Sequence, residues 1–324
     1  MKYILIFFLS LSFFYSFAQK KQNVYYFKNN GFEVQSKDSS DFVRVIEEPD
    51  STSTYFNIKE YYKSGNRKMI GKLSSFFPSL EFEDRAITFY ENGKRASIEN
   101  FKDNVLIGSA YYYHFNGVIR EERNYLEKDR NKLNPLIKYT VIQVVDSSGN
   151  KFLDNMGNGT SEIIDREGNK ESGAYVNGFK NGVWKSYNAK LKENYEDNYE
   201  DGKLIFGKTI ESNGNVINYD ESEKLPQFVG GTNAFGNFLI KNLKYPVKSR
   251  NNNIQGIVYI SFAVENDGNL SDFKIVKSVD EELDTEALRV IKLSPKWIPA
   301  MKKGKPIRSL YSLPISFQLG YSGN

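Results

Sequence analysis

The chain has 324 residues, of which 40% are apolar and 15% aromatic, and its formal net charge is +4. This length and apolar fraction are sufficient for two domains with ordinary hydrophobic cores. The 44 basic and 40 acidic side chains are mixed along the sequence without a basic block, which argues against nucleic acid as a partner. Because cysteine is absent, disulfides, thiol catalysis, thiolate metal sites and a lipid anchor on cysteine are excluded.

The N-terminus, residues 1–18, has the pattern of a secretory signal peptide. Lys2 supplies a positive start, an apolar stretch follows, and Ala18 is a small residue that fits cleavage before Gln19. The alternative is an uncleaved inner-membrane anchor, but the apolar run of 16 residues is shorter than the roughly 20 that a transmembrane helix needs. We therefore expect a periplasmic or exported protein whose mature chain begins with an N-terminal segment at 19–54.

From about residue 55 to residue 220 the sequence repeats a short unit that ends in glycine. Gly93 and Gly117 are 24 residues apart, whereas the interval from Gly65 to Gly93 is 28 because of an insertion around residues 76–78. The five repeat glycines are Gly65, Gly93, Gly117, Gly168 and Gly214. Between the copies lie pairs that tolerate the positive φ angles of hairpin turns, namely Asn177-Gly178, Asn181-Gly182 and Asp201-Gly202.

A period near 23 residues predicts stacked β-hairpins, each of two short strands and two turns. Seven such units in one stack would make a rod of roughly 70 Å. The best-formed copy runs from Tyr175 to Tyr187 and contains Gly182-Val-Trp184. It resembles MORN-type repeats and the related repeats of the YwqK antitoxin family, and the resemblance extends over residues 55–220. In this reading the repeats are a structural spacer or, alternatively, a binding surface.

The remainder, residues 221–324, predicts a second domain with the element order α, β, β, α, β. Helices are expected at 233–243, capped by Thr232, and at 284–293; strands are expected at 257–264, 270–276 and 307–319. Pro314 lies inside the last strand, and a proline cannot donate to a β-ladder. The last strand is therefore expected at a sheet edge, or bulged.

Several spaced motifs of this region resemble the C-terminal domain of TonB-type energy transducers, over residues 225–319. They include Lys244-Tyr-Pro246, the strand 256–264, Asp267-Gly268, Trp297-Ile-Pro299, Gly304-Lys-Pro306 and Leu313-Pro-Ile-Ser-Phe317. The element order given above makes a small three-stranded sheet with two helices, which follows the mostly β hairpin array. The resemblance implies a domain that works by binding a partner.

The resemblance further implies strand addition at the last strand, where an extended segment of an outer-membrane transporter or another envelope protein would pair with the free edge. The residues it places at or near the docking site are Tyr245, Pro246, Arg308, Ser309, Leu310, Tyr311, Ser312 and Ile315. The membrane would be met only through this partner or an uncleaved N-terminus, and a homodimer formed by exchange of the last strand is left open. Lys302, Lys303 and Lys305 read as a solvated loop, with a docking role as the alternative.

Two features depart from the energy-transducer pattern. The chain has nine prolines and no proline-rich spacer, and its N-terminal apolar segment lacks the polar residues expected of a helix coupled to a proton-driven motor. We therefore expect the docking domain to be reused as a binding module in transmembrane transport. The alternative function is an exported repeat scaffold or immunity-like protein that binds through its repeats.

The sequence gives no support for an enzyme, a metal site or a cofactor. His114 is the only histidine, which argues against histidine-rich metal sites and a Ser-His-Asp triad, and it lies inside a repeat strand where a structural hydrogen bond is expected. The glycine pair Gly230-Gly231 is not followed by the Lys-Ser or Lys-Thr of a phosphate-binding loop. We predict no catalytic residue.

Overall fold

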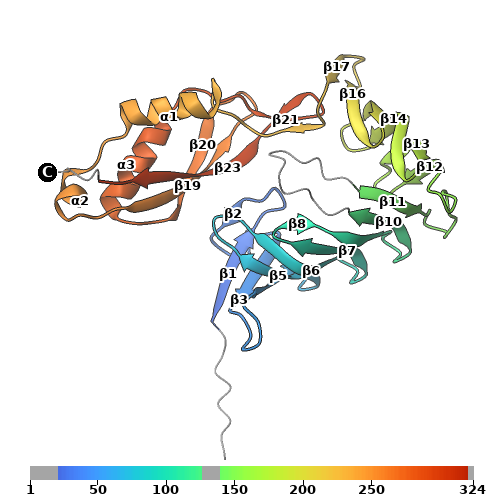
Figure 1. Cartoon of the computed structure of the whole chain (residues 1–324), viewed down its shortest axis with the longest axis horizontal. Coiled ribbons are helices and arrows are strands. Elements are labelled where there is room, and N and C mark those ends of the chain that lie inside the picture. Colours follow the sequence, from blue (N-terminus) through green and yellow to red (C-terminus); the bar gives the residue numbers. More distant parts are fainter. Residues whose placement is uncertain (1–20, 126–138, 320–324) are drawn as a thin grey trace, which may run out of the picture.

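The computed structural model describes residues 21–125 and 139–319, so the predicted signal peptide lies outside the described residues. Figure 1 shows three parts in chain order: a first large sheet in blue to teal, a second sheet in green to yellow, and a terminal part with helices in orange to red. The predicted fold class is confirmed, since an antiparallel hairpin array precedes a small three-stranded sheet with helices. None of the helices in the described ranges is long and apolar enough to cross a membrane.

The first sheet has eleven strands in the order β11-β10-β9-β7-β6-β5-β4-β3-β1-β2, with β8 beside β7. Residues of the predicted N-terminal segment belong to it, because β1 and β3 pair with each other and β3 pairs with β4. Its strands are β1 Gln22–Phe27, β2 Glu33–Val34, β3 Phe42–Glu47, β4 Phe56–Tyr62, β5 Arg67–Ser75, β6 Glu81–Phe89, β7 Arg95–Lys102, β8 Val105–Leu106, β9 Gly108–Tyr113, β10 Ile119–Tyr125 and β11 Tyr139–Val144.

The repeat glycines close hairpin turns of one kind. In the turn after β4 the amide of Tyr62 donates to Asn66 O and the amide of Gly65 donates to Tyr62 O. The same pair of bonds recurs at the other four glycines that the sequence singled out, and all five have φ between 81° and 88°. A side chain is strained at such angles, so glycine is required there and its spacing reports the hairpin period.

A ladder of side-chain hydrogen bonds connects consecutive turns of the first sheet. The Tyr62 hydroxyl donates to Phe89 O at 2.7 Å, and the Tyr90 hydroxyl donates to Tyr113 O at 2.6 Å. His114 takes the next place: its Nε2 lies 2.8 Å from Val145 O, and the residue is buried. The predicted structural role of His114 is confirmed.

The second sheet has six strands in the order β12-β13-β14-β15-β16-β17. The array is therefore split into two sheets, and the prediction of one continuous rod is wrong. The sheets meet where Val141 of β11 donates to Gly178 O and where a small core forms around Tyr175 and Trp184. The strands are β12 Gly159–Ile164, β13 Lys170–Val176, β14 Phe179–Asn188, β15 Glu193–Glu200, β16 Lys203–Ile210 and β17 Val216–Tyr219.

Two of the three predicted Asn-Gly and Asp-Gly turns are present. Asn177-Gly178 and Asp201-Gly202 have positive φ at both residues and join neighbouring strands. Asn181-Gly182 instead lies inside β14, close to a register shift against β13. This Asn-Gly pair therefore lies next to a register shift between two strands and does not form a hairpin turn.

The terminal module comprises α1 Gly231–Asn242, α2 Val247–Asn251, β19 Gly256–Val264, β20 Leu270–Lys277, α3 Glu281–Lys292 and β23 Ser309–Phe317. Its sheet has the order β20-β19-β23, so the predicted element order is confirmed with α2 added. Thr232 is not the cap of α1, which begins after Gly230. Helix α3 begins earlier than predicted because the Asp280 carboxylate accepts the amide hydrogen of Glu282 and caps it.

The largest core of the described residues lies between this sheet and its helices. Ile260, Phe262, Trp297 and Phe317 are buried there, with Leu288 packed at its margin. A short sheet of β18 Glu223–Lys224, β21 Ala300–Lys302 and β22 Lys305–Ile307 lies between this module and the second sheet of the array (Figure 1).

Candidate docking site

Strand β23 is an edge of the terminal sheet. Its register with β19 runs without interruption from Ser309 opposite Val264 to Phe317 opposite Gly256, and of the described strands only β19 pairs with it. Pro314 therefore lies on an edge strand, as predicted. Alternate side chains of β23, such as Leu313 and Phe317, enter the core.

The proline also indicates which backbone groups of β23 are unpaired. A proline is tolerated in an edge strand when its nitrogen points away from the neighbouring strand. In an antiparallel ladder every second residue turns its N–H and C=O to the same side. We infer that Leu310, Ser312 and Ser316 share the orientation of Pro314 and direct their backbone groups outward, whereas Tyr311 directs its own toward β19.

The predicted docking residues outside β23 form two groups near its opposite ends, and the other five lie in the strand itself. Tyr245 packs edge-on against Phe317 at 5.8 Å between ring centroids and donates its hydroxyl to Ile254 O at 2.5 Å, while Pro246 precedes α2. Arg308 lies at the other end, where its guanidinium binds Glu265 and Asp272. The structure thus places the two groups along one strand.

The predicted residues differ in how much of them a partner can reach. Leu310 and Ser312 are exposed, while Tyr311 is half-buried against Trp297. Ile315 is fully buried, and by the same alternation its backbone groups point toward β19. Ser309 has a buried hydroxyl without a hydrogen-bond partner among the described residues. Ser316 was not among the predicted docking residues. It lies two residues after Pro314, and this spacing identifies it as a residue whose backbone groups point outward.

The three lysines predicted to form a solvated loop do not all do so. Lys303 binds Asp197 at 2.8 Å, and Lys305 binds Glu193 at 2.5 Å and Glu211 at 2.6 Å. Asp197 and Glu193 lie in the second sheet and are only 6% and 5% exposed. We call these contacts between the β21–β22 hairpin and the second sheet the lock. Lys302 alone stays exposed, paired with Glu223.

Hydrogen bonds and burial perturb the titration of the lock. Hydrogen bonds to Glu193 and Glu211 raise the pKa of Lys305, and the hydrogen bond from Lys305 lowers the pKa of Glu211. Burial, with the hydrogen bond to Glu193, raises the pKa of Tyr195 to about 12. The ionised forms of Lys305 and Glu211 are therefore favoured, and the hairpin is held by charge pairs across a wide pH range.

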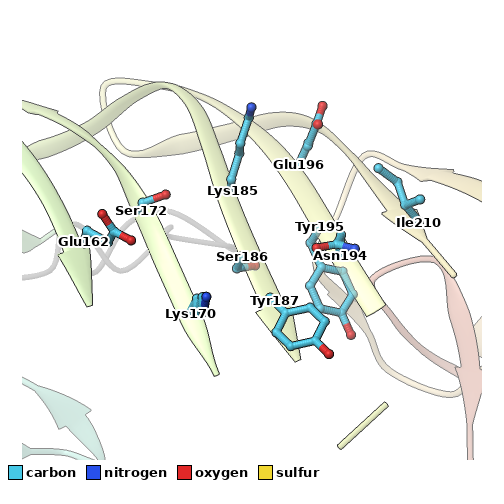
Figure 2. A pocket seen from close by; sticks show the side chains of 10 residues that line it. All are labelled: Glu162, Lys170, Ser172, Lys185, Ser186, Tyr187, Asn194, Tyr195, Glu196 and Ile210. Atoms are coloured by element: carbon cyan, nitrogen blue, oxygen red, sulfur yellow. The ribbon is translucent and has the colours of Figure 1, made fainter. Parts of the chain in front are cut away.

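A shallow groove of about 310 Å³ lies on one face of the second sheet (Figure 2). Its side chains form two cross-strand rows: Lys170, Tyr187, Asn194 and Ile210 in one, and Glu162, Ser172, Lys185 and Glu196 in the other. The groove mixes both signs of charge with the half-buried ring of Tyr187. In the part of the chain that the structure describes, no group of three or more His, Asp or Glu side chains is arranged as metal ligands would be.

Comparison with known families identifies only the terminal part of the chain. Residues 241–319 match the model of a protein family described as the Gram-negative bacterial TonB protein C-terminal. No curated protein matches the chain. The match contains β19, β20, α3 and β23 and leaves the array outside, so the MORN- and YwqK-type assignment stays a prediction. The terminal module is thus similar to the C-terminal, protein-docking part of TonB proteins.

Proposed function

We propose that this chain is a periplasmic binding protein whose terminal module docks an extended segment of an outer-membrane transporter, or of another envelope protein, by strand addition to β23. Through this docking it takes part in transmembrane transport. The single observation that carries the proposal is the edge strand β23, nine residues long, in the segment that matches the TonB C-terminal family. Domains of this family bind partners rather than catalyse reactions.

The chemistry of the site fits a peptide backbone as ligand. An unpaired strand edge offers amide donors and carbonyl acceptors at regular spacing, and an extended peptide satisfies them without side-chain specificity. The outward groups inferred for Leu310, Ser312 and Ser316 would supply affinity. The exposed side chains of the same strand, such as Leu310 with 41% exposure, would supply selectivity.

The test removes one outward amide while leaving the fold intact. Ser312→Pro should be accepted by β23 as Pro314 is, yet it deletes a donor and adds a ring at the edge. We expect binding of synthetic peptides from the periplasmic ends of outer-membrane transporters to weaken about tenfold, which corresponds to about 1.4 kcal/mol and to one lost hydrogen bond. Fluorescence anisotropy of labelled peptides on the full mature chain measures this.

Ser312→Ala is the matched control, because it removes the hydroxyl and retains the amide. Equal peptide affinity of the alanine and proline variants would rule out strand addition at this position. A second candidate function, binding through the repeats, is favoured by the groove on the second sheet. It is tested in the same assay by Tyr187→Ala, which should reduce binding only if the groove is the binding surface.

A further inference from the structure

The insertion that interrupts the repeat period reaches the terminal module. It lies between β5 and β6, where two adjacent phenylalanines point to different parts of the molecule. Phe76 packs edge-on against Phe56 in the core of the first sheet, at 4.9 Å between ring centroids. Phe77 instead packs edge-on against Tyr259 of β19, at 4.7 Å, and the Lys277 ammonium lies 5.4 Å from the centroid of the Phe77 ring. The insertion that interrupts the repeat period thus contacts the terminal module through Phe77.

The turn between β1 and β2 makes a second set of contacts with the same sheet. The guanidinium carbon of Arg308 lies 3.9 Å from the centroid of the Phe32 ring, and Glu33 forms an ion pair with Lys274 of β20. Gly31 lies beside the Leu310 side chain of β23. Together the insertion and the turn contact β19, β20 and β23. The first sheet lies on the side of the terminal sheet that faces away from α1 and α3 (Figure 1).

These contacts differ from the lock in their exposure to solvent. The side chains of Lys274 and Glu33 are 53% and 36% exposed, whereas those of the lock carboxylates Asp197 and Glu193 are 8% and 7% exposed. Exposed ion pairs are weak and are screened by salt, and partly buried pairs are screened much less. The module is therefore tied to the array at two places of unequal strength.

We propose that the β1–β2 turn and the Phe76–Pro78 insertion form a latch that closes over the outer face of the terminal sheet and opens independently of the lock. When the latch opens, the module turns about the β21–β22 hairpin, and the outer faces of β19, β20 and β23 become accessible. Ionic strength shifts this equilibrium toward the open form, because the Glu33–Lys274 pair is screened. The latch involves only contacts within the chain and operates with or without a docked partner.

The absence of native cysteine allows the latch to be measured with unique spin labels. Labels at Lys102→Cys and Ile240→Cys, both exposed, report the separation of the first sheet and the module. Labels at Lys203→Cys and Lys302→Cys, both exposed, report the separation of the second sheet and the β21–β22 hairpin across the lock. We expect the first distance distribution to broaden and shift to longer distances between about 0.05 M and about 1 M salt, and the second to stay unchanged.

Variants separate the latch from a general effect of salt. Phe77→Ala combined with Lys274→Glu should give the open distribution at low salt. Adding Glu33→Lys to Lys274→Glu alone restores an ion pair of reversed sign and should restore the closed distribution. Lys241→Glu, the same charge change on α1, is the matched control and should have no effect.

Two results would overturn the inference. A first distribution that stays narrow at both salt concentrations and in the latch variants would mean a permanent interface. Equal broadening of both distributions would mean that the module is not held by the lock. Circular dichroism and the fluorescence of Trp184 and Trp297 establish in each case that both parts remain folded.

Discussion

Tyr62, Tyr90 and His114 occupy one position in three successive turns of the first sheet, and each donates a hydrogen bond to a backbone carbonyl of the next unit. A carbonyl oxygen can only accept, so Nε2 of His114 carries a proton in this structure. The histidine is therefore a replacement for tyrosine in a structural ladder.

This equivalence predicts the effect of substitutions at His114. His114→Phe leaves Val145 O without its donor in a buried position, and we expect a loss of about 1–2 kcal/mol in the free energy of unfolding. His114→Tyr supplies a hydroxyl, as the two preceding turns do, and should lose less. Urea unfolding monitored by circular dichroism compares the two. Equal stability of the two variants would contradict the ladder.

At the scale of single elements, two glycines without positive φ have opposite roles. Gly173 lies in β13 beneath the indole of Trp184, and a Cβ atom there would approach the ring to 2.3 Å. Gly236 lies in α1, where a Cβ atom would meet nothing within 4 Å. Gly173 leaves room for the indole ring of Trp184. Gly236 makes no such room and only lowers the stability of α1.

Replacing each glycine by alanine should therefore change stability in opposite directions. We expect Gly173→Ala to cost about 1–3 kcal/mol through overpacking against Trp184. Gly236→Ala should stabilise α1 by about 1 kcal/mol, since glycine is a poor helix former. Thermal unfolding followed by the fluorescence of the two tryptophans measures both changes. A neutral Gly173→Ala would show that the indole can move aside.

On the scale of the whole molecule, the lock joins residues more than ninety positions apart: Lys305 pairs with Glu193 and Glu211. The pKa of Glu211 is lowered in the fold by the hydrogen bond from Lys305, so its contribution is present above the unfolded value of about 4.3 and is lost as pH falls through the lower folded value. The pKa of Lys305 is raised, so its contribution is present below about 10.4 and is lost as pH rises through the higher folded value.

The lock should therefore weaken in acid below about pH 4 and in strong base above about pH 10. Lys305→Met removes both shifts, and we expect a lower urea midpoint at neutral pH together with a smaller further loss between about pH 5 and pH 3 than in the unsubstituted chain. Lys302→Met is the control, since its pair with Glu223 is exposed. An identical acid dependence of Lys305→Met and the unsubstituted chain would show that other carboxylates set it.

The docking site could be predicted only in part. The motif spacing placed Tyr245 and Arg308 near the last strand, and Pro314 predicted an edge. The sequence motifs could not indicate that Ile315 is buried. The register of β23 against β19 decides which side chains of β23 face the core and which face solvent. The engagement of Arg308 with Glu265, Asp272 and Phe32 likewise depends on chain segments distant in sequence.

Local stereochemistry accounts for the features that could be predicted from the sequence. The repeat glycines, which alone accept positive φ at low cost, define the hairpin period, and apolar periodicity defines the element order of the terminal module. Three features depend on long-range packing: the division of the array into two sheets, the binding of Lys303 and Lys305 to buried carboxylates, and the contact of Phe77 with Tyr259 of the terminal module. These contacts join residues far apart in the chain, and no local pattern encodes which distant charge or ring a side chain will meet.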